Sequence, residues 1–420
     1  MKSNTLILLL VFVFLSFSRS EAQSSFKVMF YNLLNYPDET AVANREEDLE
    51  FIISDYQPDL FLVCELNNIT GANTVLNITQ TAIRPSFEMA TFVSNTSDDN
   101  FGDSNDLQNL LYYDSSKFSL EEEVIVPTNL RDFNVYRLRL NTVNQLTNPV
   151  ELYVIVCHLK ASSGPDNAQR RFEMVQELDN YLNTLPSDSH VLLGGDLNLY
   201  TALESAFQEL LDTTNNITFT DPANQIGNWS NNTTFIDVFT QSTRTQSGFG
   251  GSRGGFDDRF DFILTSENML TSTDLAYTPD SYKVYGNNGV TSCYNSRINS
   301  SNCAGPEYSE ALREALHNFS DHLPVTVEIE TSETLLNTNN FVLKETWSIE
   351  QSLVRSEVII NLNNVSPNGR SLSIYNQLGQ LITEKPINQQ QIKIATNNFS
   401  EGLYYVTCGR LQPLKFLVVK

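Results

Sequence analysis

Short apolar runs separated by polar segments recur along the chain between Phe26 and Glu330. They are rich in β-branched and aromatic residues, which is typical of strands, and they read FKVMFYNLL, DLFLVCEL, NLLYYD, VYRLRLNTV, ELYVIVCHL, HVLLGGDLN, RFDFILT and PVTVEIE. Two stretches, 44–56 and 167–185, carry the spacing of helices instead. Many strands with few helices between them predict an α/β sandwich, in which two sheets pack face to face with helices outside.

The charge of the chain restricts how it could hold a phosphate-bearing ligand. Its 420 residues are enough for two or three domains, and its formal net charge is −24. No basic patch or stripe of the nucleic-acid-binding kind is present, so such a ligand would have to be held locally, for example by divalent cations. The acidity could equally serve solubility in a salty exterior.

The first residues have the pattern of a cleavable signal peptide. Lys2 precedes an apolar run from Leu6 to Phe17, and the small residues Ser20 and Ala22 fit a signal-peptidase site. We therefore expect a signal peptide over residues 1–22, and a run this short does not favour a retained membrane anchor. No later segment is apolar enough to cross a bilayer. The mature protein is expected to be exported and soluble, without stable membrane insertion.

Five cysteines remain to be placed. Cys64 and Cys157 lie in buried-strand patterns and are expected to act as small core residues. Cys293 and Cys303 flank the loop CYNSRINSSNC, and export to an oxidising compartment permits a bridge between them. Cys408 has no evident partner in the sequence.

Polar residues stand at the ends of several predicted strands. Asn32 ends MFYNLLN, and Glu65 terminates the buried run LFLVCEL. A buried carboxylate is costly unless it is paired or binds metal, so Glu65 is a candidate metal ligand. His158 and Lys160 follow another buried strand in VIVCHLK. Taken alone, such a histidine is more often a satisfied core residue.

Two further motifs are more specific. In VLLGGDLNLY, Gly194 and Gly195 would let the backbone turn tightly, and Asp196 and Asn198 would project to the same side, two residues apart. The run DRFDFIL, with Asp261, precedes the pair Asp321 and His322 of NFSDHLPV by some sixty positions. An acid beside a histidine before a strand could also be a simple polar turn. The stretch SGFGGSRGGFDDR just before DFIL is predicted to be a flexible loop that could contact phosphate.

Together these residues have the chemistry that phosphodiester hydrolysis requires. Hard oxygen ligands such as Glu65 and Asp321 suit Mg²⁺ or Mn²⁺. An imidazole paired with an acid, such as His322, can stay protonated and bind a phosphate oxygen, because the opposite charge favours the charged form. Asp196 could accept a proton from the attacking water.

At these motifs the sequence resembles the endonuclease/exonuclease/phosphatase superfamily, whose members are similar to pancreatic-type deoxyribonuclease. The resemblance covers residues 24–330 as one catalytic domain and implies a four-layered α/β sandwich, two packed mixed sheets flanked by helices. Its most specific pieces are GGDLN and SDHLPV. It implies the following roles: Asn32, Glu65 and Asp321 at the metal; Asp196 toward water; Asn198, His158 and His322 at the phosphate; and Asp261 as the buried partner of His322.

A second, smaller unit is expected after residue 340. Residues 331–340 are polar and without periodicity, which predicts a linker, and residues 341–420 contain short alternating strands typical of a small β-sandwich. The pieces SIYNQLGQLI, FSEGLYYV and KFLVVK resemble the type A sorting domain of the type IX secretion system of Bacteroidetes. That resemblance implies export through the periplasm by the type IX machinery, to the cell surface or the medium.

These observations predict a secreted, divalent-metal-dependent phosphodiesterase, specifically a broad-specificity extracellular nuclease with nucleic acid as its substrate and no obligate protein partner. Lys160, the last residue of the HLK motif, and Arg170, in the arginine pair that follows it, resemble substrate-binding positions of bacterial extracellular nucleases. Two alternatives remain open from the residues. The chain could act on phospholipid or inositol phosphates, or it could be a catalytically silent surface binding protein on the same fold.

Overall fold

The computed structural model describes residues 24–98, 107–336, 346–363, 371–408 and 413–420. The chain divides into two compact units, with the division between Leu336 and Asn337. The expected signal peptide, residues 1–22, lies outside the described residues. Among the described residues, no helix combines the length and the apolar character that crossing a membrane requires.

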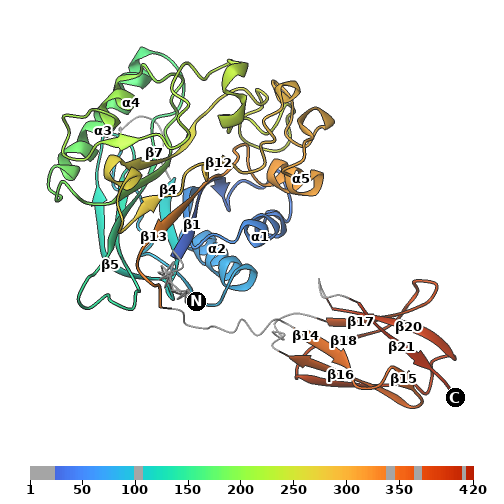
Figure 1. The fold of residues 1–420 in the computed structure, drawn as a ribbon. Helices are drawn as coiled ribbons and strands as arrows, with labels where there is room; N and C mark the ends of the chain where they lie inside the picture. Colours follow the sequence, from blue (N-terminus) through green and yellow to red (C-terminus); the bar gives the residue numbers. More distant parts are fainter. Residues whose placement is uncertain (1–23, 99–106, 337–345, 364–370, 409–412) are drawn as a thin grey trace, which may run out of the picture. The chain divides into compact units, whose positions relative to one another are not determined.

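The first unit is built on two mixed sheets (Figure 1). In the first sheet, β1 lies between β13, to which it is antiparallel, and β2, to which it is parallel. Its strand order is β11-β13-β1-β2-β4-β3, with β12 also paired to β13. The strands are β1 (Ser24–Tyr36), β2 (Leu60–Leu66), β3 (Phe87–Met89), β4 (Gln108–Asp114), β11 (Ala276–Tyr277), β12 (Lys283–Val284) and β13 (Val325–Thr331).

In the second sheet, β7 and β8 are parallel neighbours, and β10 runs antiparallel to β8. The strand order is β5-β6-β7-β8-β10-β9. The strands are β5 (Phe118–Val126), β6 (Phe133–Leu140), β7 (Glu151–His158), β8 (Val191–Asp196), β9 (Phe219–Thr220) and β10 (Asp261–Ser266).

Helices cover the outer faces of both sheets, as Figure 1 shows. One buried apolar cluster joins α1, α2 and α5 to the first sheet and continues between the two sheets, and a second joins α3 and α4 to the second sheet. The expected fold class, a four-layered α/β sandwich, is therefore confirmed. The helices are α1 (Arg45–Tyr56), α2 (Ile69–Ala82), α3 (Pro165–Leu182), α4 (Ser205–Leu210) and α5 (Glu310–Phe319), with short 3-10 turns η1 (Thr233–Val238), η2 (Glu267–Leu270), η3 (Thr291–Cys293) and η4 (Ser301–Cys303).

The two glycines of GGDLN lie within β8 and do not form the tight turn that the sequence suggested. They are required because neighbouring atoms lie too close to leave room for a side chain. A Cβ at Gly194 would lie 2.7 Å from Leu62 Cδ2, in the facing sheet, and a Cβ at Gly195 would overlap Cys157 on the neighbouring strand. Because interiors are close-packed, no larger residue fits there without displacing its neighbours. Gly194 therefore sets how closely β8 approaches the first sheet, and Gly195 makes room for Cys157 of β7.

The second unit consists of strands alone within its described residues. A three-stranded sheet, β14-β16-β19, and a five-stranded sheet, β15-β21-β20-β17-β18, enclose one apolar cluster. This arrangement of two sheets around one core is the small β-sandwich that the sequence predicted. Its strands are β14 (Thr346–Ile349), β15 (Leu353–Val354), β16 (Glu357–Asn363), β17 (Ser371–Asn376), β18 (Leu381–Pro386), β19 (Gln391–Ala395), β20 (Gly402–Thr407) and β21 (Leu414–Val418).

The stretch 331–340, predicted to be a linker, belongs in part to the first unit. Thr331 is the last residue of β13, and the backbone N–H of Leu336 donates to the carbonyl of Asn141 at 2.7 Å. Leu335 packs against the large apolar cluster. Residues 337–340 lie outside the described residues. The linker therefore cannot begin before residue 337.

A disulfide joins Cys293 to Cys303, as the sequence had allowed. Cys64 and Cys157 are buried and not disulfide-bonded, which confirms that they are core residues. Cys408 is also buried and outside any disulfide.

Candidate active site

Asn32 connects the two sheets at one end of the sandwich. It lies in β1, in parallel register with Cys64, so the next residue of β2, Glu65, comes close to it. The Asn32 Nδ2 group donates to Glu65 Oε1 at 3.0 Å and to Asp196 Oδ2, in the second sheet, at 3.1 Å. The backbone N–H of Asn35 donates to Glu65 Oε2 at 3.0 Å. Polar residues at the ends of strands from different sheets thus share one hydrogen-bonded cluster.

His158 and Asp196 are the last residues of β7 and β8 and are paired in parallel register. His158 Nε2 lies 3.5 Å from Asp196 Oδ2 and 3.9 Å from Glu65 Oε1. The backbone N–H of Asn198 donates to Asp196 Oδ1 at 3.0 Å, and its side-chain amide donates to the carbonyl of Leu159 at 3.3 Å. Asn198 therefore lies beside the cluster, although its amide is turned toward the backbone.

Asp261 begins β10, opposite Asp196 in the antiparallel register. His322, which follows α5 and precedes β13, meets it, with Nδ1 and Asp261 Oδ2 2.7 Å apart. On its other side His322 Nε2 lies 3.8 Å from Asp196 Oδ2. The imidazole is thus held between an acid on β10 and an acid on β8. The adjacent Asp321 is not its hydrogen-bond partner.

Asp321 is held by a different set of groups. Its Oδ2 accepts the backbone N–H of Ser252 at 2.7 Å and the side-chain amide of Gln241 at 3.3 Å. The same amide nitrogen lies 2.6 Å from His322 Nε2, so Gln241 contacts both members of the Asp321–His322 pair. Sequence reasoning missed Gln241, because TQSTRTQS has neither strand nor helix periodicity.

Crowding of acids in this buried place shifts their proton affinities. Burial, with the nearby charge of Asp321, raises the pKa of Glu65. Burial, with the charges of Asp261 and Glu65, raises the pKa of Asp196 to about 8, even though His322 acts in the opposite direction. Carboxylates packed this closely destabilise one another's charged forms. An added positive charge would offset that cost.

The two histidines have opposite electrostatic surroundings. Burial alone would lower the pKa of His322, but the charges of Asp261, Asp321 and Asp196 raise it well above the ordinary value. Burial lowers the pKa of His158 far below its ordinary value, and the neighbouring cations act in the same direction. The surrounding acids therefore favour the imidazolium form of His322, and burial favours the neutral form of His158.

The acid cluster fits a hard divalent cation. Asp321 Oδ1 is buried and has no hydrogen-bond partner among the described residues, which is unusual for a buried acceptor. Glu65, His158 and Asp196 each offer one ligand atom within 4.8 Å of the others, and so do Asp196, Asp261 and His322. Carboxylate oxygens are the donors that Mg²⁺ and Mn²⁺ prefer.

Of the basic residues around the site, one is structural and two lie near His158. Arg171 is structural, since it donates to the carbonyls of Lys160 and Ser162 at 2.8 and 2.9 Å and forms an ion pair with Glu204 at 2.6 Å. Lys160 lies near enough to His158 to help lower its pKa, and so does Arg131, which sequence reasoning missed. Arg131 donates to the carbonyl of Leu159, the group that also accepts the amide of Asn198.

Arg170 lies on α3, one residue before Arg171, and is half-buried. Its part in substrate binding stays a prediction.

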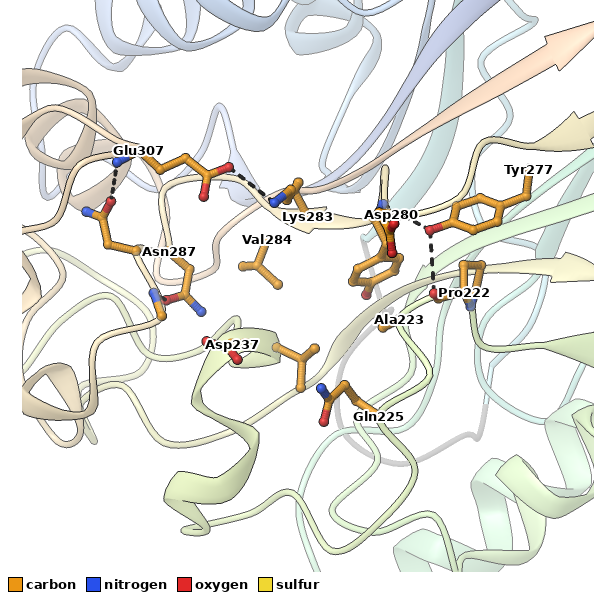
Figure 2. A pocket seen from close by; sticks show the side chains of 14 residues that line it. Pro222, Ala223, Gln225, Asp237, Tyr277, Asp280, Lys283, Val284, Asn287 and Glu307 are labelled. Atoms are coloured by element: carbon orange, nitrogen blue, oxygen red, sulfur yellow. Dashed lines mark hydrogen bonds and ion pairs between the residues drawn. The ribbon is translucent and has the colours of Figure 1, made fainter.

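A separate hollow of about 440 Å³ lies outside this cluster and shares none of its residues (Figure 2). Some of its polar groups contact one another: Lys283 forms an ion pair with Glu307 at 3.4 Å, and the hydroxyl of Tyr277 donates to the carbonyl of Pro222. The side-chain amide of Asn287 donates to the carbonyls of Ile236 and Phe239. Its lining includes the acids Asp237, Asp280 and Glu307 but no histidine, and among the described residues none of these acids belongs to a cluster that could hold a metal ion. The strand-end cluster is therefore the candidate active site.

Residues 354–415 match the family model described as the secretion system C-terminal sorting domain. This confirms the sequence-based interpretation of the tail as a sorting domain, and it marks the chain for secretion or attachment at the cell surface. A comparison with curated proteins finds no match.

The chain is also similar to solved structures, each covering about the length of its first unit. With zebrafish (D. rerio) TDP2 complexed with a single-strand DNA product, the identity is 16% and the TM-score 0.46, over 73% of this chain and 100% of that one. With an endonuclease/exonuclease/phosphatase from Bacteroides vulgatus, the identity is 12% and the TM-score 0.45, over 73% of this chain and 99% of that one. With a mannosyl-6-phosphatase from Bacteroides thetaiotaomicron, the identity is 14% and the TM-score 0.42, over 72% of this chain and 99% of that one.

Proposed function

We propose that the protein is a secreted, divalent-metal-dependent phosphodiester hydrolase of the endonuclease/exonuclease/phosphatase superfamily. The observation that carries this proposal is the meeting of Glu65, Asp196 and His322, from three distant parts of the chain, in one buried cluster. Strand-end polar residues that served only as turns or caps would not need to converge. Four carboxylates crowded together are costly unless a cation is bound.

The residues divide the chemistry among them. Glu65 and Asp321 would hold the cation, with Asn32 orienting Glu65 through its amide. The cation, when bound, would act as a Lewis acid on a phosphate oxygen and orient the substrate. Asp196, hydrogen-bonded to Asn32, would accept the proton of the attacking water. His322, charged and steadied by Asp261, would donate to a phosphate oxygen where negative charge develops. His158, whose neutral form burial favours, would donate a hydrogen bond to the phosphate without adding charge.

We further propose nucleic acid as the substrate, which makes the protein a broad-specificity extracellular nuclease. Arg131 and Lys160 support this choice, because both lie close to His158 in a chain whose net charge is −24. A polyanion would be attracted only locally by such a chain. Lys160 and Arg170 would then contact the phosphate backbone on one side of the cluster, and Mg²⁺ or Mn²⁺ would supply positive charge within it.

The full-length secreted protein should be assayed with Mg²⁺ on bis-p-nitrophenyl phosphate, plasmid DNA, RNA and sphingomyelin in parallel. The proposal expects hydrolysis of the generic diester and of both nucleic acids, and loss of all three activities in Asp196→Ala and His322→Ala. Cleavage of sphingomyelin alone would replace the substrate class and keep the chemistry. Turnover unchanged in both variants would overturn the mechanism, and no turnover of any substrate would favour a silent binding protein.

A further inference from the structure

The glycine-rich segment that the sequence marked as a flexible loop is anchored against the acid cluster. Residues 249–252, called here the bracket, run between the side chains of Glu39 and Asp321. A Cβ at Gly251 would lie 2.5 Å from Asp321 Cγ, and a Cβ at Gly250 would overlap the Glu39 carboxylate. Both glycines have positive φ, +77° at Gly250 and +61° at Gly251, a region that glycine adopts without steric cost. A residue with a side chain at either position would require Glu39 or Asp321 to move.

The bracket makes a direct bond to the candidate metal ligand. The backbone N–H of Ser252 donates to Asp321 Oδ2 at 2.7 Å, a length typical of charge-assisted bonds. Asp321 Oδ1 is left buried and without a hydrogen-bond partner among the described residues. One oxygen is therefore fixed by the protein, and the other is available as a ligand.

A buried arginine holds the bracket in place. Arg244 is fully buried and donates to the carbonyls of Phe249 and Gly250 at 2.7 and 3.0 Å. The same guanidinium donates to the carbonyls of His317 and Asn318 at 2.9 Å each, at the end of α5. Cations are favoured at a helix C-terminus, where carbonyls lack helical partners. Arg244 thus ties the bracket to the helix that ends just before Asp321.

The base of the loop is also closed, so the bracket does not depend on Arg244 alone. The backbone N–H of Ser242 donates to the carbonyl of Gly255 at 2.7 Å, and the N–H of Gly255 donates to that of Arg244 at 3.0 Å. Outside the base, the disulfide-closed segment lies alongside, because the N–H of Ile298 donates to the carbonyl of Thr243. The loop is therefore a compact one whose ends meet.

We propose that the bracket, braced by Arg244, is a positioning element that fixes the carboxylate of Asp321 for cation binding. This inference rests on the proposed function, in which Asp321 is a metal ligand. Groups that orient a ligand carboxylate set its affinity for the metal, and their loss typically weakens binding about 10- to 100-fold. The Gly250–Gly251 pair is needed because any side chain there would displace the two acids that flank it.

The test is calorimetric titration of MnCl₂ into the chelator-treated full-length protein without substrate, comparing wild type with Gly251→Ala and Gly248→Ala. Gly248 also has a positive φ, +95°, but a Cβ there would meet nothing within 4 Å. It therefore reproduces the backbone strain without the contact to Asp321. We expect the Kd for Mn²⁺ to rise about 10- to 100-fold in Gly251→Ala, and to stay unchanged in Gly248→Ala.

Arg244→Lys provides a second test, because lysine keeps the charge and cannot bond four carbonyls. It should weaken Mn²⁺ binding in the same direction, and it decides the question if circular dichroism shows that Gly251→Ala has not folded. Equal affinity in wild type and Gly251→Ala, or equal losses in Gly251→Ala and Gly248→Ala, would overturn the inference and leave the proposed function standing. A wild-type protein that binds no Mn²⁺ would overturn both.

Discussion

Asp261 and His322 are separated by 61 positions in the chain, yet Asp261 Oδ2 and His322 Nδ1 lie 2.7 Å apart in the buried cluster. The acid comes from the first residue of β10, and the imidazole comes from the loop between α5 and β13. Because the two sheets contribute one member each, this contact exists only when the sandwich is assembled.

Replacing Asp261 by Asn should leave the fold intact and remove the charge that keeps His322 cationic. We expect kcat for bis-p-nitrophenyl phosphate to fall about 100-fold or more, since a positioned proton donor contributes on that order. Steady-state kinetics with Mg²⁺ measure the effect. Asp280→Asn, an exposed acid at the separate hollow, is the matched control and should be fully active. Equal rates in the two variants would show that the Asp261–His322 pair is not used.

Adding Mn²⁺ should stabilise the protein against heat, because a ligand that binds the native state shifts the unfolding equilibrium. At one hundred times the Kd the gain is about 2.7 kcal/mol, seen as a rise in Tm. Glu65→Gln removes a candidate ligand and should reduce this rise, whereas Asp280→Asn should keep it. A rise of the same size in Glu65→Gln would place the cation elsewhere.

Gly194→Ala should lower stability through overpacking between the sheets. The added methyl would lie 2.7 Å from Leu62 Cδ2, and extra atoms in a packed core cost about 1 to 3 kcal/mol. Urea unfolding followed by circular dichroism measures the loss. Gly254→Ala, where a Cβ would meet nothing within 4 Å, is the control and should be neutral. An unchanged midpoint for Gly194→Ala would mean that the sheets separate at no cost.

Removing the disulfide should destabilise the first unit. Cys293 and Cys303 are ten positions apart, and closing a loop of that order stabilises a protein by about 2 to 3 kcal/mol. The double substitution Cys293→Ser and Cys303→Ser should therefore lower the urea midpoint. Cys408→Ser, which breaks no disulfide, serves as the comparison. Identical midpoints for the double variant and wild type would contradict this.

Much of the fold follows from local patterns. The alternating run after Pro324 became β13, and the apolar periodicity of 167–185 became α3, although the helix begins at Pro165 and ends at Leu182. α2 was not predicted, because ITGANTVLNITQTA is rich in Thr and Asn, which favour other local structure. Its Asn68 cap and its packing on the first sheet form the helix nonetheless.

The candidate site was partly readable because its acids and histidines stand at the ends of strong strand patterns. Glu65 and Asp196 could be found this way, since a carboxylate after a buried run is conspicuous. Gln241 and Arg244 could not, because they lie in an irregular segment and act through contacts with residues some 70 to 80 positions away. The Gly251 contact likewise depends on how the loop is folded back, which no periodicity encodes.

The acid cluster forms only when the two sheets are joined, because the single side-chain amide of Asn32 bonds one acid from each sheet. A chain that has folded one sheet but not joined it to the other has the same amino acids and no usable arrangement of them. If the proposed function holds, a molecule whose two sheets have not yet joined would be unable to cleave its substrate, so the exported chain would stay inactive until the sandwich is assembled.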